Sequence, residues 1–220
     1  MYHSRGRFLR LFPTVPAEAR KQMKLMSVVA VGAAVTAAAW AGDGAQAEQP
    51  TVTVCMSRRG NPTAFRAEAI ATQVFARIGV RIDWPADQDS CILSPDSIAI
   101  TLSDQTPPGL YPGVLAYAAP YQGTRIVVFY DRVLNTVTRS QQSLLLGYVL
   151  AHEISHLLQG ISRHSASGIM KRKWEARDYV EMRWNALRFT EYDVSLIRDG
   201  LYERRLQVSR HASTGAIAAQ

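Results

Sequence analysis

The stretch AHEISHLLQGISRHSASGIM, residues 151–170, contains three of the five histidines in the chain. His152 and His156 are four residues apart, so on a helix both imidazoles project from the same face, one turn apart. This spacing allows both rings to bind one tetrahedral zinc ion at about 2.0–2.1 Å. The order His-Glu-x-x-His also places Glu153 within reach of a metal-bound water, where a carboxylate acts as general base.

A third ligand is expected from the segment that follows this helix. Gly160 stands where a C-cap glycine lets the chain leave the helix, and His164 comes four residues later. Three neutral imidazoles leave the fourth position of a zinc ion open for water, which is typical of a catalytic site. Alternatively His164 is a surface loop histidine, and Glu175 or Asp178 is then the third ligand.

The alternative for the helix itself is a solvated face on which the histidines have no ligand. Ile154, Leu157 and Leu158 argue against it, because they make the segment apolar over much of its circumference. Buried His and Glu side chains need partners. We therefore expect the helix to be buried and its histidines to bind a metal.

These residues resemble the motif of the metzincin clan of zinc metallopeptidases, H-E-x-x-H-x-x-G-x-x-H followed by a Met-turn. The three histidines, Glu153 and Gly160 match in type and order, with two more residues between the second and third histidines than is usual. The resemblance implies that Met170 is the Met-turn methionine beneath the metal. Arg172 stands where some metzincins have a tyrosine. Most of residues 51–205 also resembles a group of small exported bacterial proteins of unassigned role, and residues 147–174 carry the motif.

The resemblance implies a secreted zinc-dependent metalloendopeptidase with one zinc ion per chain and a peptide or protein substrate. Glu153 would take a proton from the metal-activated water and pass it to the leaving amine. Two alternatives stay open: an exported zinc-binding module without proteolytic activity, and a zinc amidase acting on cell-wall substrates. Residues 114–118, with Leu115 and Tyr117, would pair with an extended substrate by β-augmentation, although an ordinary sheet edge is equally compatible.

Hydrophobic periodicity predicts an α+β fold. Residues 51–56 and 80–84 read as strands on either side of a helix at 63–78, whose apolar stripe includes Phe65 and Ala69, and this order predicts a βαβ unit. Further strands are expected at 97–103, 114–120 and 124–131, with a helix at about 140–159 and another from about 190 to 207. The resemblance implies a metzincin-like mixed twisted sheet, an active-site helix, a Met-turn and a C-terminal helix.

The N-terminal region has the pattern of a signal peptide. The apolar run LMSVVAVGAAVTAAAWAG, residues 25–42, follows Arg20, Lys21 and Lys24, and Ala45-Gln46-Ala47 fits a cleavage site. We expect residues 1–47, with a long n-region, to be a signal peptide, residues 48–208 to form one domain, and 209–220 to be a flexible tail. An uncleaved membrane anchor is the alternative. A cleaved leader predicts a secreted or periplasmic protein.

Charge gives little indication of further partners. The full chain has 25 Lys and Arg against 18 Asp and Glu, a formal charge of +7. Residues 1–47 contain six of the basic and two of the acidic residues, which leaves 19 against 16, or +3, for residues 48–220. We therefore expect a monomer with no nucleic-acid partner, which contacts a membrane only through an uncleaved signal segment.

Cys55 and Cys91 are the two cysteines of the chain. An even pair in an exported protein predicts one disulfide. Two buried free thiols are the alternative.

Overall fold

The computed structural model describes residues 49–217 except 58–59, 88–90, 93, 95 and 122, and gives no side-chain environment for 211–217. Residues 45–220 form one compact unit. The signal peptide predicted at 1–47 lies outside the described residues. None of the helices in the described part of the chain is long and apolar enough to cross a membrane.

A five-stranded mixed sheet organises this unit, with strand order β2-β1-β3-β5-β4. Its strands are β1 (Thr51–Met56), β2 (Arg81–Asp83), β3 (Ile98–Ser103), β4 (Ala116–Ala118) and β5 (Arg125–Phe129). Strand β1 is parallel to β2 and β3, and β3 is parallel to β5, whereas β4 runs antiparallel to β5 at the sheet edge. The predicted α+β class and the βαβ start are confirmed.

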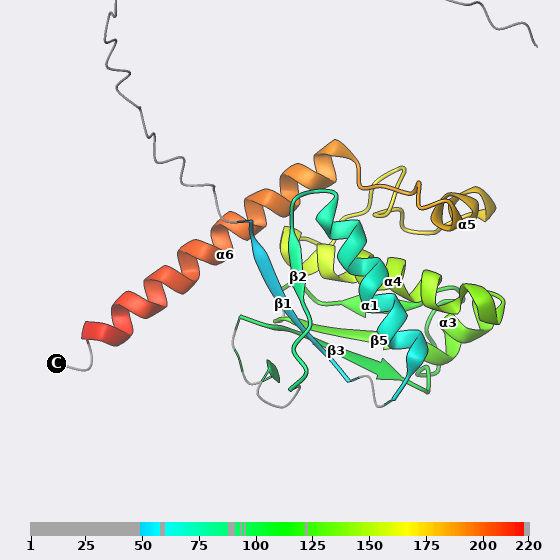
Figure 1. The fold of residues 1–220 in the computed structure, drawn as a ribbon, viewed down its shortest axis with the longest axis horizontal. Coiled ribbons are helices and arrows are strands. Elements are labelled where there is room, and N and C mark those ends of the chain that lie inside the picture. Colours follow the sequence, from blue (N-terminus) through cyan, green and yellow to red (C-terminus); the bar gives the residue numbers. More distant parts are fainter. Residues whose placement is uncertain are drawn as a thin grey trace, which may run out of the picture. The chain divides into compact units, whose positions relative to one another are not determined.

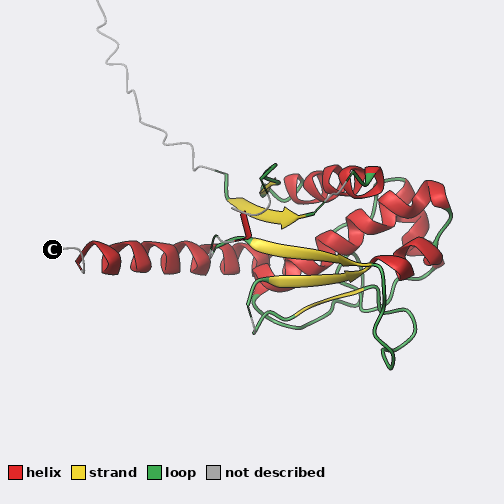
Figure 2. Cartoon of the chain, turned by 90° about the horizontal axis from the view of Figure 1, so that it is seen from below, coloured by secondary structure: helices red, strands yellow, loops and turns green. Residues whose placement is uncertain are grey.

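Helices cover one side of the sheet (Figure 2). Helix α1 (Pro62–Ala76) connects β1 to β2, and α4 (Gln142–Gln159) packs against α1. The short helices α3 (Tyr130–Thr136) and α5 (Ala176–Arg183) and a 3₁₀ turn at Arg139–Gln141 complete the set with the C-terminal helix α6 (Glu191–Ile217). The sequence did not predict α3 or α5.

The predicted apolar stripe of α1 is confirmed in the C-terminal half of the helix, where Val74 and Phe75 are buried. In the N-terminal half Phe65 and Ala69 are exposed, and alanines pack inward instead. The reason is the close approach of α4, because a Cβ added to Gly147 would lie 2.6 Å from Cγ2 of Ile70. Only small side chains fit between helices this close, so alanines form the contact near Gly147. The inward alanines are Ala64, Ala67 and Ala71.

Helix α6 begins as predicted and ends later. The backbone N–H of Asp193 donates to Thr190 Oγ1, and the Thr190 N–H donates to Asp193 Oδ2, so these two residues cap the helix reciprocally. The helix continues to Ile217 instead of ending near Gln207, since no glycine or proline interrupts residues 201–214. Most of the tail expected to be flexible is therefore helical, and this part of α6 extends away from the sheet (Figure 1).

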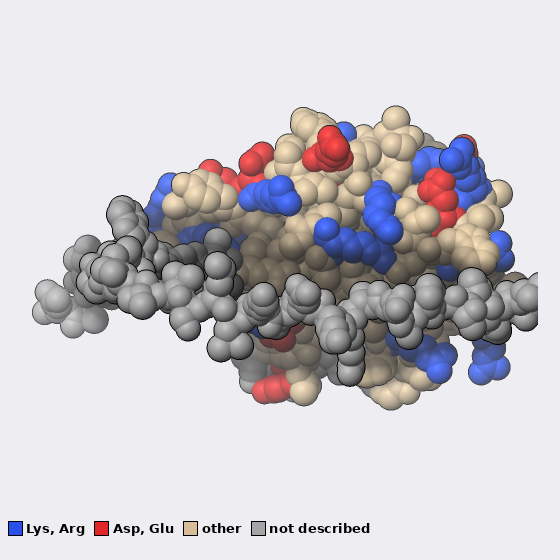
Figure 3. Space-filling view, turned by 45° about the horizontal axis from the view of Figure 1, so that its top comes forward, with Lys and Arg blue, Asp and Glu red and all other residues tan. Residues whose placement is uncertain are grey.

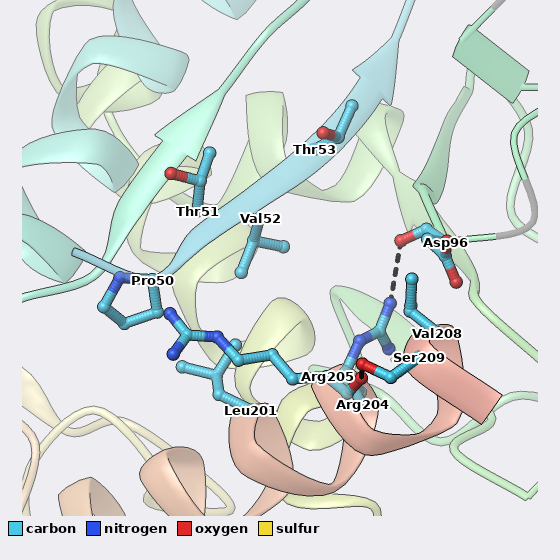
Figure 4. A pocket seen from close by; sticks show the side chains of 10 residues that line it. All are labelled: Pro50, Thr51, Val52, Thr53, Asp96, Leu201, Arg204, Arg205, Val208 and Ser209. Carbon is cyan, nitrogen blue, oxygen red and sulfur yellow. Dashed lines mark hydrogen bonds between the residues drawn. The ribbon is translucent and has the colours of Figure 1, made fainter. Parts of the chain in front are cut away.

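The middle of α6 borders a cavity of about 410 Å³ beside β1 (Figure 4). There Arg204 donates from Nη2 to the Asp96 carbonyl oxygen at 2.9 Å. This contact ties α6 to the segment that precedes β3.

A disulfide joins Cys55 on β1 to Cys91, which confirms the prediction and rules out two free thiols. Both residues are buried. The bond holds Cys91 against the sheet. On the face of the molecule seen in Figure 3, basic and acidic side chains are interspersed among neutral ones.

Candidate metal centre

Helix α4 carries His152, Glu153 and His156 into the interior. From Leu145 to Gln159 every residue of this helix is buried, so a solvated face is excluded. The helix ends at Gly160, whose φ of 66° is the left-handed conformation that favours glycine. The predicted C-cap is confirmed, and it releases the chain toward His164.

Hydrogen bonds define which nitrogen of each buried imidazole is protonated. His152 Nδ1 lies 2.8 Å from the Ile169 carbonyl oxygen, and His156 Nδ1 lies 3.3 Å from that of Ile161. A carbonyl oxygen only accepts, so each Nδ1 carries the proton and donates. Each neutral ring then has a lone pair on Nε2, which is the arrangement found in histidines that bind metals.

The two Nε2 atoms face each other across 3.1 Å. Since both carry lone pairs, they form no hydrogen bond with each other, and a cation between them would satisfy both. Two imidazole nitrogens on a tetrahedral zinc ion are separated by about 3.4 Å, given Zn–N distances of about 2.0–2.1 Å. The observed separation is close to this value, so the donor pair fits zinc.

His164 completes a cluster of three imidazoles. The ligand atoms of His152, His156 and His164 all lie within 4.8 Å of one another. The ring centroid of His164 is 5.3 Å from that of His152 and 5.0 Å from that of His156. His164 is exposed, whereas the other two are buried, so the cluster lies where the buried helix reaches the surface.

The segment Ile169–Lys171 holds two of these histidines in place. The Ile169 carbonyl accepts from His152, and it also accepts from Trp174 Nε1 at 3.2 Å. The Met170 carbonyl accepts from the backbone N–H of Ser165 at 2.8 Å, directly after His164. The Met170 side chain is fully buried in the core.

Asp193 on α6 anchors the loop from the other side. Its carboxylate accepts hydrogen bonds from Arg163 Nη1 at 2.8 Å and from Ser165 Oγ at 2.6 Å, so both neighbours of His164 are held. Burial alone would raise the pKa of Asp193, but hydrogen bonds from Ser165, Thr190 and Arg163 outweigh burial and lower it. Asp193 is therefore ionised at neutral pH and stabilises the loop.

Burial keeps the three imidazoles neutral. It lowers the pKa of His152 to about 3, with a further contribution from the charge of His156, and it lowers the pKa of His156 to about 4. The pKa of His164 is also lowered, first by burial and then by the charges of Arg172 and Arg163. Neutral imidazoles are the form that binds metal ions.

Glu153 lies in the same cleft as His152 and His164. Burial raises the pKa of its carboxyl group to about 8, and a hydrogen bond with the Ala118 backbone on β4 partly opposes that shift. In the metal-free protein, burial therefore favours the protonated form of this carboxyl group.

The cleft has a volume of about 490 Å³. One wall is formed by residues 111–116 and includes Leu115. Tyr117 does not line the cleft, because its side chain lies beside Phe129 with ring centroids 6.0 Å apart.

Arg132 on α3 braces this wall. Its Nη1 donates to the carbonyls of Tyr111 at 2.8 Å and Val114 at 2.9 Å, and its Nη2 donates to that of Leu110 at 3.4 Å. The sequence did not predict this role, because these hydrogen bonds join a helix to a loop about 20 residues earlier. An arginine after an apolar strand carries no local signal of such a contact.

The alternative third ligands lie outside the histidine cluster. Glu175 is exposed, and Asp178 is buried 2.6 Å from Lys171 Nζ. The two residues cap α5, since the Glu175 backbone N–H donates to Asp178 Oδ2 at 2.7 Å. Trp174 packs edge-on to His152 at 5.7 Å between ring centroids.

No protein-family model matches the chain, and no curated protein matches it. Among solved structures, the archaemetzincin of Methanopyrus kandleri is similar, with 14% sequence identity and a TM-score of 0.45. The match covers 70% of this chain and 96% of that one. A similarity at this level identifies no family, so the function has to be inferred from the geometry of the site.

Proposed function

We propose that this protein is a zinc-dependent metallopeptidase whose ligands are His152, His156 and His164. The observation that carries the proposal is the pair of Nε2 lone pairs 3.1 Å apart, with a third imidazole beside them. Each Nδ1 of the buried pair donates to a backbone carbonyl, so the lone pairs of both Nε2 atoms are left to bind one metal ion together. An uncharged three-imidazole set beside a cleft favours a catalytic site over a closed structural one.

Zinc bound there would polarise a substrate carbonyl and lower the pKa of a coordinated water toward 7. The remaining chemistry belongs to the chain. The carboxylate of Glu153 takes a proton from the attacking water and delivers it to the leaving amine nitrogen. The carbonyls of Ile169 and Ile161 keep the rings of His152 and His156 in one tautomer and orientation.

We further propose that Met170 forms a Met-turn beneath the metal. Its backbone joins the His164 loop through Ser165, and its neighbour Ile169 orients His152. The buried methionine side chain supports both ligands by packing.

An extended peptide is the substrate that the cleft geometry favours. Among the strands of the described residues, β4 pairs only with β5, so its outer edge is a candidate for β-augmentation. Residues 111–116, including Leu115, lead into β4 and line the cleft beside Glu153. A peptide added along this edge would pass His152 and Glu153.

Export is part of the proposal. The Cys55–Cys91 disulfide supports it, because such bonds persist mainly in oxidising compartments. The signal-peptide pattern of residues 1–47 gives the route, and mass analysis of the exported protein would test cleavage after Ala47.

Glu153→Gln separates catalysis from metal binding. We expect the variant to retain zinc, and its hydrolysis of a peptide library to fall by about 10²–10⁴-fold relative to the wild type. Glu175→Gln is the matched control, since Glu175 is exposed and outside the cleft lining. A zinc-loaded wild-type protein that cleaves no peptide would refute the peptidase proposal and leave a zinc-binding module or a cell-wall amidase.

A further inference from the structure

The cleft beside the metal centre is lined unevenly with charge. The basic residues in its lining are Lys171, Arg172 and Lys173, and the acidic residue is Glu153. Glu153 is buried and follows His152 in the chain, and its carboxyl group is the proposed general base. The three consecutive basic residues form one part of the wall and make that part positively charged.

Lys171 has a structural role. Its Nζ lies 2.6 Å from Asp178 Oδ2 and 3.4 Å from Glu175 Oε2. These pairs neutralise the ammonium group and fix the start of α5. Lys171 therefore adds little positive charge to the cleft.

Arg172 and Lys173 are different. Both are exposed, and neither forms an ion pair with a residue in the described ranges. Arg172 and Lys173 line the same cleft as His152 and His164. Two positive side chains with no acidic partner there stand at the entrance to the site.

The rest of the cleft offers no competing charge. Its other lining side chains are mainly apolar and aromatic, including Val114, Leu115, Val149, Trp174 and Tyr179. Such a surface accepts apolar parts of a substrate, and apart from Glu153 and the histidines the ionisable groups of the described lining that could discriminate by charge are basic. An acidic side chain would be attracted, and a lysine or arginine would be repelled.

We propose that the site selects peptides carrying an Asp or Glu side chain near the scissile bond, bound by Arg172 and Lys173. This inference rests on the proposed peptidase function. An extended peptide advances about 3.4 Å per residue, and Arg172 lines the same cleft as His164, so we expect the acidic residue within about two positions of the bond. A guanidinium binds a carboxylate through two parallel hydrogen bonds, which makes Arg172 the principal contact.

The catalytic test uses peptides that differ only by Asp or Asn at each of these positions. For at least one position we expect kcat/KM to be about tenfold higher for Asp, and the ratio to shrink in high salt. The Asp/Asn ratio should fall to one or below in Arg172→Glu and in Lys173→Glu. Arg198→Glu, on the exposed surface of α6, should keep the wild-type ratio. A wild-type ratio of one at every position would overturn the proposal.

A binding arm separates this proposal from the peptidase proposal. Zinc-loaded Glu153→Gln protein is titrated with the same fluorescently labelled peptides, so no catalysis is needed. Tighter binding of the Asp peptide without any cleavage by the wild type would refute the peptidase and support the charge selectivity. Cleavage that depends on Glu153, with equal binding of both peptides, would refute the selectivity alone.

Discussion

The guanidinium of Arg163 lies 2.8 Å from the carboxylate of Asp193, which is itself fully buried. This ion pair joins α6 to the loop that carries His164. The loop leaves α4 at Gly160 and has no helical backbone of its own to orient the third ligand. Tertiary contacts therefore determine where His164 lies.

Asp193→Asn should weaken metal binding without removing a ligand. The substitution removes the charge that Arg163 and Ser165 share, so the His164 loop loses its anchor. Loss of a group that orients ligands costs about 10–100-fold in metal affinity. Competition with a zinc chelator would measure the effect.

Asp199→Asn is the control, because Asp199 is exposed on the same helix. Equal zinc affinity in the Asp193 variant and the wild type would show that Asp193 does not position the ligand.

Arg132→Ala should loosen residues 110–114, which lead into and form part of the cleft wall. The backbone carbonyls of Leu110, Tyr111 and Val114 lose the hydrogen bonds that Arg132 donates, so this loop should become more mobile. We expect faster proteolysis within the loop and, for a cleaved peptide, a several-fold rise in KM with a smaller change in kcat. Arg139→Ala, at an exposed position in the 3₁₀ turn, is the control. Unchanged proteolysis would contradict the bracing role.

The buried histidines should make the metal-free protein sensitive to acid. In the unfolded chain His152 binds a proton near pH 6.5, whereas burial lowers its folded pKa to about 3. Between these values the unfolded state binds more protons, so stability is full above pH 6.5 and is lost as the pH falls. His156 acts in the same direction over 6.5 to about 4.

The raised pKa of Glu153 acts in the opposite direction, so Glu153→Gln is the proper background for this measurement. Urea unfolding of metal-free protein from pH 7 to pH 4 should show a steep loss of stability. Adding His152→Gln should reduce the slope. Equal slopes would mean that His152 titrates normally in the folded protein.

Replacing Cys55 and Cys91 by alanine should destabilise the fold substantially. The cysteines are 36 residues apart, and closing a loop of that length stabilises the folded state by about 4 kcal/mol. The double variant should unfold at a clearly lower urea concentration than the oxidised wild type. A midpoint unchanged from the oxidised protein would contradict this prediction.

The sequence predicted the metal-centre helix well because its signals are local. The His152–His156 spacing, the apolar neighbours and the C-cap at Gly160 all lie within nine residues, and the structure agrees with each. The strands were predicted for the same reason, since alternating β-branched residues report directly on a half-buried strand.

What the sequence did not predict depends on contacts between distant segments. Helix α5 is short and polar, and its two capping acids were considered as metal ligands because nothing local shows that Asp178 pairs with Lys171. Helix α3 follows β5 with no turn residue between them. The hydrogen bond between Asp193 and Arg163 joins residues 30 positions apart, so no local pattern predicts it.

The most direct test of the three-histidine zinc site is the zinc content of the purified protein and of its His164→Ala variant. We expect about one zinc ion per wild-type chain and markedly weaker binding in the variant, since a zinc site needs its full ligand set. Unchanged affinity in the variant would remove His164 from the site. Absence of zinc from the wild type, after incubation with the metal, would contradict a zinc site formed by His152, His156 and His164.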